Sequence, residues 1–191
     1  MVQAISKFIY TKILGWKLVG DFPKELKKYV VIGAPHTSWK DFHIALLARN
    51  SWGTKINFIG KKSIFKWPWG FFVRAFGGSP VDRTKSTNLV DAIVQLFDSK
   101  EEFRLALSPE GTRQYVEKWK TGFYYVAMNA KMPIALGYVD FKTKTAGVGK
   151  VIHPSGDIEK DMREIVAFYN TINGKIPANY SPDVRYSGTQ K

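Results

Sequence analysis

The chain has 191 residues, of which 45% are hydrophobic and 15% aromatic, so it is long and apolar enough for one domain with a buried core. This composition excludes wholesale disorder. The absence of cysteine excludes disulfides, thiolate metal sites and a cysteine nucleophile. A formal charge of +13 predicts an anionic partner: lipid, a phosphorylated small molecule or nucleic acid. No RNA-recognition, KH or zinc-finger pattern accompanies this charge, so nucleic acid is not the expected partner.

The first 22 residues are predicted to form an amphipathic helix. Apolar side chains recur at helical spacing on one side, at Ile5, Phe8, Ile9, Ile13 and Trp16. Lysines interrupt this run, which is too short and too polar to span a membrane. Such a helix either lies in the headgroup layer of a membrane or packs on the core of its own domain. We expect a membrane-associating helix over residues 1–22 and a single domain over residues 23–191.

The rest of the chain alternates short apolar runs with segments of helical periodicity. The expected strands cover residues 28–34, 55–60, 103–107, 133–141 and 147–153. The expected helices cover residues 38–50, 86–99, 121–131 and 157–172, and the tail after residue 174 is expected to be irregular. This alternation predicts an α/β fold with a single mixed, largely parallel sheet flanked by helices.

His36 and Asp41 are the first candidates for chemistry. His36 follows the first apolar strand, where α/β proteins place functional residues, and Asp41 falls in the first turn of the next helix. From there its carboxylate is able to hold the imidazole in one tautomer. The alternative is structural, because Ser38 and Asp41 also have the spacing of a helix capping box.

Two loops contain arginine next to glycine. Residues 108–113 follow a predicted strand and read Ser-Pro-Glu-Gly-Thr-Arg, and residues 77–83 form a glycine turn that ends in Asp-Arg. Glycine allows a close approach of the backbone to a ligand, and arginine matches a phosphate with two parallel hydrogen bonds. Taken alone, either loop is more often an ordinary solvated turn than a phosphate site.

In this order the motifs resemble those of the glycerophospholipid acyltransferase family, which includes the lysophosphatidate (1-acylglycerol-3-phosphate) acyltransferases. The family's histidine, four residues and aspartate are met by His36 and Asp41, and residues 77–83 resemble its second block. Its Pro-Glu-Gly-Thr-Arg block is matched letter for letter at residues 109–113, and residues 132–134 resemble its fourth block. Ser108 replaces the usual aromatic residue, and residues 135–137 depart from the usual Ile-Val-Pro run.

The resemblance implies a role for each motif residue. His36 would be the general base, with Asp41 orienting the imidazole, and no metal or cofactor is expected. The acceptor would be bound by five residues, which are Arg83, Glu110, Gly111, Thr112 and Arg113. The donor would be acyl-CoA or an acyl carrier protein thioester.

The resemblance therefore implies an O-acyltransferase of phospholipid biosynthesis that acylates a lysophospholipid, with 1-acylglycerol-3-phosphate as the expected acceptor. It would be cytoplasmic and peripheral on the inner, anionic face of a membrane. The aromatic run at residues 65–76 either packs in the core or forms a rim that dips into lipid. The alternatives are an acceptor such as an amino-acid-based lysolipid, or a non-catalytic basic protein that binds membrane or nucleic acid.

Overall fold

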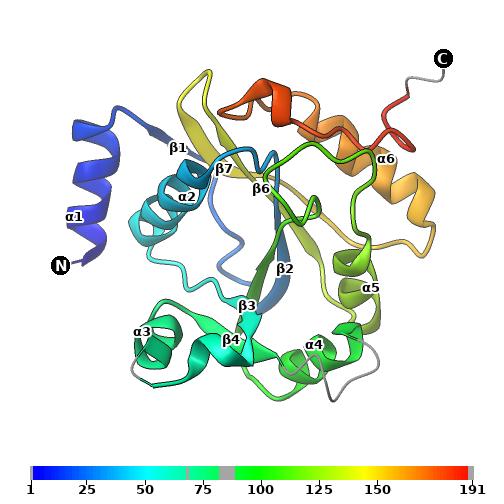
Figure 1. Cartoon of the computed structure of the whole chain (residues 1–191), viewed down its shortest axis with the longest axis horizontal. Coiled ribbons are helices and arrows are strands. Elements are labelled where there is room, and N and C mark those ends of the chain that lie inside the picture. The colour runs from blue at the N-terminus through cyan, green and yellow to red at the C-terminus, as the bar shows by residue number, and fades with distance from the viewer. Residues whose placement is uncertain (1, 68, 82–88, 189–191) are drawn as a thin grey trace.

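The computed structural model describes residues 2–67, 69–81 and 89–188 (Figure 1). Its main sheet has five strands in the order β1-β7-β6-β2-β5. In chain order they are β1 (Lys17–Val19), β2 (Lys28–Gly33), β5 (Phe103–Leu107), β6 (Ile134–Asp140) and β7 (Thr145–Ile152). Strand β2 pairs in parallel with β5 and β6, β7 is antiparallel to β6, and β1 is parallel to β7. The predicted α/β fold with a mixed, largely parallel sheet is confirmed.

A second, two-stranded parallel sheet extends this arrangement. It pairs β3 (Phe58–Lys61) with β4 (Gly78–Val81), and an isolated parallel bridge from Asn57 to Leu105 joins it to β5. The short helix α3 (Trp69–Ala75) lies beside it, after a 3-10 turn at Lys62–Phe65. This sheet accounts for the predicted strand over residues 55–60 and contains the start of the second motif block.

Helices cover both faces of the main sheet. Helices α4 (Leu89–Asp98), α5 (Gly122–Asn129) and α6 (Ile158–Tyr169) lie to one side in Figure 1, and α1 (Val2–Phe8) and α2 (Trp39–Trp52) lie to the other. Because side chains alternate along a strand, Val30 and Ile32 of β2 face the first group. Tyr29 and Val31 face the opposite side. Strand β2 is therefore buried on both faces, as its continuous apolar sequence predicts.

The N-terminal segment differs from the predicted helix over residues 1–22. Helix α1 continues as a π-helical turn at Ile9–Ile13, and Gly15 then adopts a left-handed conformation with φ +68°. Residues Lys17–Val19 form β1 instead, since the edge of β7 offers free hydrogen-bonding groups. Trp16 is buried against Tyr10 and Phe141 rather than sharing the outer face.

The outer face of α1 and the π-helical turn is apolar and exposed. Ile5, Phe8 and Ile13 are 52%, 60% and 64% exposed, so three of the five residues of the predicted stripe do face outward. Within the described part of the chain, none of the helices has the length and apolar character needed to cross a membrane.

Candidate active site

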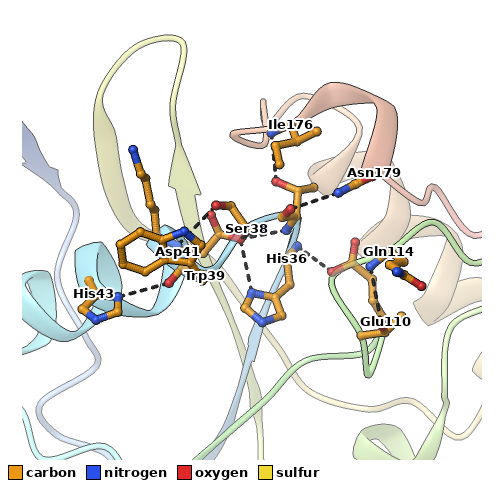
Figure 2. Close-up of polar contacts among 12 residues, drawn as sticks. His36, Ser38, Trp39, Asp41, His43, Glu110, Gln114, Ile176 and Asn179 are labelled. Atoms are coloured by element: carbon orange, nitrogen blue, oxygen red, sulfur yellow. Dashed lines mark hydrogen bonds and ion pairs between the residues drawn. The ribbon is translucent and has the colours of Figure 1, made fainter.

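His36 stands in the loop between β2 and α2, directly beyond the carboxyl end of β2. Its Nδ1 lies 3.2 Å from Asp41 Oδ2, and the side chain of Asp41 is 8% exposed against 31% for that of His36 (Figure 2). The backbone N–H groups of Thr37 and Ser38 donate to the same Oδ2 at 2.7 and 2.8 Å. These donors hold the carboxylate in place beside the ring. The carboxylate favours the tautomer with its proton on Nδ1, which leaves Nε2 free to accept a proton.

The two interpretations of Asp41 are compatible. Ser38 and Asp41 form a capping box at the start of α2, in which the Ser38 hydroxyl accepts from Lys40 N–H and Asp41 accepts from Ser38 N–H. A carboxylate at a helix N-terminus also gains from the helix dipole. The same Oδ2 therefore caps the start of α2 and contacts the imidazole of His36.

Glu110 supports the same loop from the other side. Its Oε2 accepts a hydrogen bond from the His36 backbone N–H at 2.6 Å, and the residue is only 2% exposed. Burial raises the pKa of Glu110 to about 7, although the hydrogen bond from His36 opposes this shift. Within the described residues Glu110 makes no hydrogen bond or ion pair to Arg113, and its Oε1 has no partner. The carboxylate thus contacts the loop that carries His36 rather than the neighbouring arginine.

The loop after β5 forms part of a polar pocket next to His36. Gly111 has φ +69°, a left-handed conformation that favours glycine, and its Cα lies close to the flexible end of the Lys120 side chain. Thr112 and Arg113 then line a pocket of about 490 Å³. The other lining residues come from the His36 loop, the 112–114 turn and the C-terminal segment, and are Thr37, Ser38, Trp39, Gln114, Ile176 and Asn179.

An apolar cavity of about 310 Å³ lies between α2 and the sheet. His36 and Asp41 line it together with Gly33 of β2 and Gly137 of β6, which are register partners. A Cβ at Gly33 would meet no atom within 4 Å, so the missing side chain leaves open space. The remaining lining is mainly apolar and includes Phe22, Val31, Phe42, Ala45, Leu46, Trp52, Ala106 and Val139.

The predicted site residues are therefore placed unequally. His36, Asp41 and Glu110 are in direct contact, and Gly111, Thr112 and Arg113 follow in the adjoining loop. Arg83 lies outside the described residues. The apolar cavity and the contribution of the C-terminal segment were both missed by the sequence reasoning. Gly33, near the end of one predicted strand, and Gly137, within another, were the available signal for the cavity.

A model of the acyltransferase family matches residues 18–135, which is more than half of the chain and includes every motif residue above. The chain belongs to the acyltransferase family. A comparison with curated protein sequences found no match.

Among solved structures, the acyltransferase chain is similar to the 1-acyl-sn-glycerophosphate (LPA) acyltransferase PlsC from Thermotoga maritima, with a TM-score of 0.56. The two are 15% identical, and the match covers 87% of this chain and 76% of the other. At this identity the likeness concerns the fold alone.

Among residues 2–67, 69–81 and 89–188, no group of three His, Asp or Glu side chains is arranged to hold a metal ion. His43, the histidine nearest to His36 in sequence, is exposed on α2 with its Nδ1 3.1 Å from Trp39 O. It therefore offers His36 no shared metal site.

Proposed function

We propose that this acyltransferase transfers a fatty acyl chain from a thioester to the hydroxyl group of a lysophospholipid, with 1-acylglycerol-3-phosphate as the favoured acceptor. One observation carries the proposal: the His36–Asp41 pair lines an apolar cavity, and the next residues of the same loop, Thr37 to Trp39, line a pocket that also contains Arg113. An apolar cavity suits the acyl chain of the donor, and Arg113 suits the phosphate of the acceptor. The reacting carbonyl and hydroxyl would then meet at the imidazole.

The proposed reaction is direct acyl transfer. His36 Nε2 accepts the proton of the acceptor hydroxyl as its oxygen attacks the thioester carbonyl carbon. The new C–O bond forms, the C–S bond breaks, and the imidazolium returns the proton to the leaving thiolate. Asp41 stabilises the imidazolium through Nδ1, so no covalent acyl-enzyme and no cofactor is required.

Residues of the polar pocket would hold the acceptor. Arg113 would bind the phosphate through two parallel hydrogen bonds, with Thr112 as a further donor and Gly111 allowing close backbone approach. The family resemblance assigns Arg83 to the same phosphate. Glu110 is better suited to a positioning role, since its carboxylate holds the His36 N–H and would repel a phosphate.

We further propose that the protein is peripheral on an anionic membrane, with acyl-CoA or acyl carrier protein as its donor. The exposed apolar side chains of Ile5, Phe8 and Ile13 lie on a segment that also carries Lys7 and Lys12. Lysines near an anionic surface each contribute roughly 1 kcal/mol to binding, and apolar side chains add a part that salt does not screen. Residues 1–22 would thus act as the membrane-associating element.

The test is an acylation assay with purified protein, a panel of lysolipid acceptors, and acyl-CoA or acyl carrier protein as donor. His36→Ala should lose about 10²- to 10⁴-fold in rate, the usual effect of removing a general base. His43→Ala is the matched control, because it removes a histidine from the adjacent helix and should retain the wild-type rate. If the protein acylates only an amino-acid-based lysolipid, the proposed acceptor is wrong, while the proposed type of reaction stands. A folded His36→Ala variant with more than about a tenth of the wild-type rate would exclude the proposed base.

A further inference from the structure

The segment after α6 is attached to the loop that carries His36, although it lies beyond the residues matched by the family model. The Thr37 hydroxyl accepts a hydrogen bond from Ile176 N–H, and the Thr37 carbonyl accepts one from the Asn179 side chain, both at 3.2 Å (Figure 2). Gly174 passes so close that a Cβ there would lie 2.8 Å from Thr37 Oγ1. Thr37 is 1% exposed, so these contacts seal the backbone next to His36.

A second anchor joins this segment to the loop that follows Arg113. The Ser181 hydroxyl accepts from Val116 N–H at 2.7 Å, and Asp183 Oδ2 accepts from Trp119 N–H at 2.9 Å. Both Ser181 and Asp183 are fully buried. Because the segment is fixed at Thr37 and again at residues 116–119, the intervening side chains have a defined position over the polar pocket.

The pocket that this segment helps to line is amphipathic. Thr112 and Arg113 provide polar and cationic groups, whereas Trp39 and Ile176 present apolar side chains to the same space. Trp39 is 58% exposed and Ile176 is 42% exposed, so neither is covered by the protein's own core. A purely ionic ligand would leave these two apolar surfaces in water, but a phosphate with an attached hydrocarbon chain would cover them.

We propose that Ile176, together with Trp39, binds the first methylene groups of the acceptor's own acyl chain and thereby selects an acylated glycerophosphate over free glycerophosphate. The inference rests on the proposed function and adds a specificity-determining residue from the C-terminal segment. With the phosphate on Arg113, the ester-linked chain leaves the pocket across the two apolar side chains. Free glycerophosphate has no chain to bury and gains nothing from them.

Direct binding measurements test this selection without requiring turnover. Isothermal titration calorimetry would give the Kd of octanoyl glycerophosphate, used as a monomer, and of free glycerophosphate. The variants are Ile176→Ser and, as a matched control, Val184→Ser. Val184 is 45% exposed on the same segment but does not line the pocket. Thermal unfolding of each variant checks that the segment remains folded.

We expect the wild-type protein to bind the octanoyl ligand at least about tenfold more tightly than glycerophosphate. Ile176→Ser should weaken octanoyl binding about fivefold and leave glycerophosphate unchanged, and Val184→Ser should change neither. Equal weakening of both ligands by Ile176→Ser, or no effect on either, would overturn the inference. So would a wild-type protein without preference for the octanoyl ligand. Selective binding without acyl transfer would refute the proposed function and leave the selection by Ile176 standing.

Discussion

The buried carboxylate of Glu110 makes the stability of the protein depend on pH. Its pKa is raised by burial to about 7 in the folded protein, against an ordinary value of 4.5. Between these two values the unfolded chain releases the proton while the folded protein retains it, so stability falls as pH rises. One pKa unit corresponds to about 1.4 kcal/mol. The wild-type protein should therefore lose about 2 to 3 kcal/mol of unfolding free energy between pH 5 and pH 8 through this group.

Glu110→Gln replaces the titratable carboxyl group with an amide but keeps an oxygen that accepts the hydrogen bond from His36 N–H. The new amide N–H group would take the place of Oε1, which has no partner, at a cost of about 1 to 3 kcal/mol that does not vary with pH. We expect the variant to be less stable than wild type at pH 5 and equally or more stable at pH 8. The pH dependence of the difference, rather than its sign at one pH, carries the prediction.

Urea denaturation at several pH values from 5 to 8 measures this difference. Glu102→Gln is the control, because the Glu102 side chain is 55% exposed and its removal should leave the pH dependence of wild type intact. If the unfolding free energies of wild type and Glu110→Gln run parallel from pH 5 to pH 8, the carboxylate does not titrate near neutrality. The explanation of Glu110 as a desolvated acid would then be wrong.

Three further predictions concern the other parts of the site. Asp41→Asn should reduce both the acylation rate and the unfolding free energy, the latter by about 1 kcal/mol, because one carboxylate contacts the imidazole and caps the helix. Full activity with lower stability would mean that Asp41 only caps the helix. Arg113→Lys should raise the acceptor KM and leave the donor KM unchanged in steady-state assays, since lysine does not form two parallel hydrogen bonds to a phosphate. The reverse pattern would assign the loop to the donor. Phe8→Ser combined with Ile13→Ser should weaken binding to liposomes in flotation assays, most of all at high salt, where the attraction of lysines to anionic headgroups is screened. Unchanged binding would exclude α1 as the anchor.

The regular elements of the fold were predictable because their signals are local. The strand expected over residues 28–34 is Lys28–Gly33, and the strand expected over residues 103–107 is Phe103–Leu107. The helix expected over residues 38–50 is Trp39–Trp52: its start agrees with the capping spacing of Ser38 and Asp41, and it runs two residues further, to the left-handed Gly53 with φ +72°. The motif residues were also predictable, because parallel strands bring their carboxyl ends to one edge of the sheet.

The features that were missed depend on contacts between distant segments. Residues Lys17–Val19 form a strand because β7 leaves an edge unpaired, which periodicity in the first 22 residues does not reveal. The tail after residue 174 has little regular structure, in agreement with its prolines, yet Ser181 and Asp183 are buried by their contacts with residues 116–119. Residue propensities predict the backbone conformation of such a segment, but not the distant residues that it contacts.

The two faces of the main sheet are packed differently, and the difference is what the proposed binding of an acyl chain requires of a stable fold. Under α4, α5 and α6 the strands present large side chains such as Ile32, Leu105 and Leu136, all fully buried. Under α2 the strands present small residues, including Gly33 and Gly137, and a cavity remains. An unfilled apolar cavity forgoes packing contacts, which an acyl chain would restore on binding. The affinity for the chain would therefore come from contacts that the empty site lacks, while the opposite face keeps the sheet rigid and His36 in position.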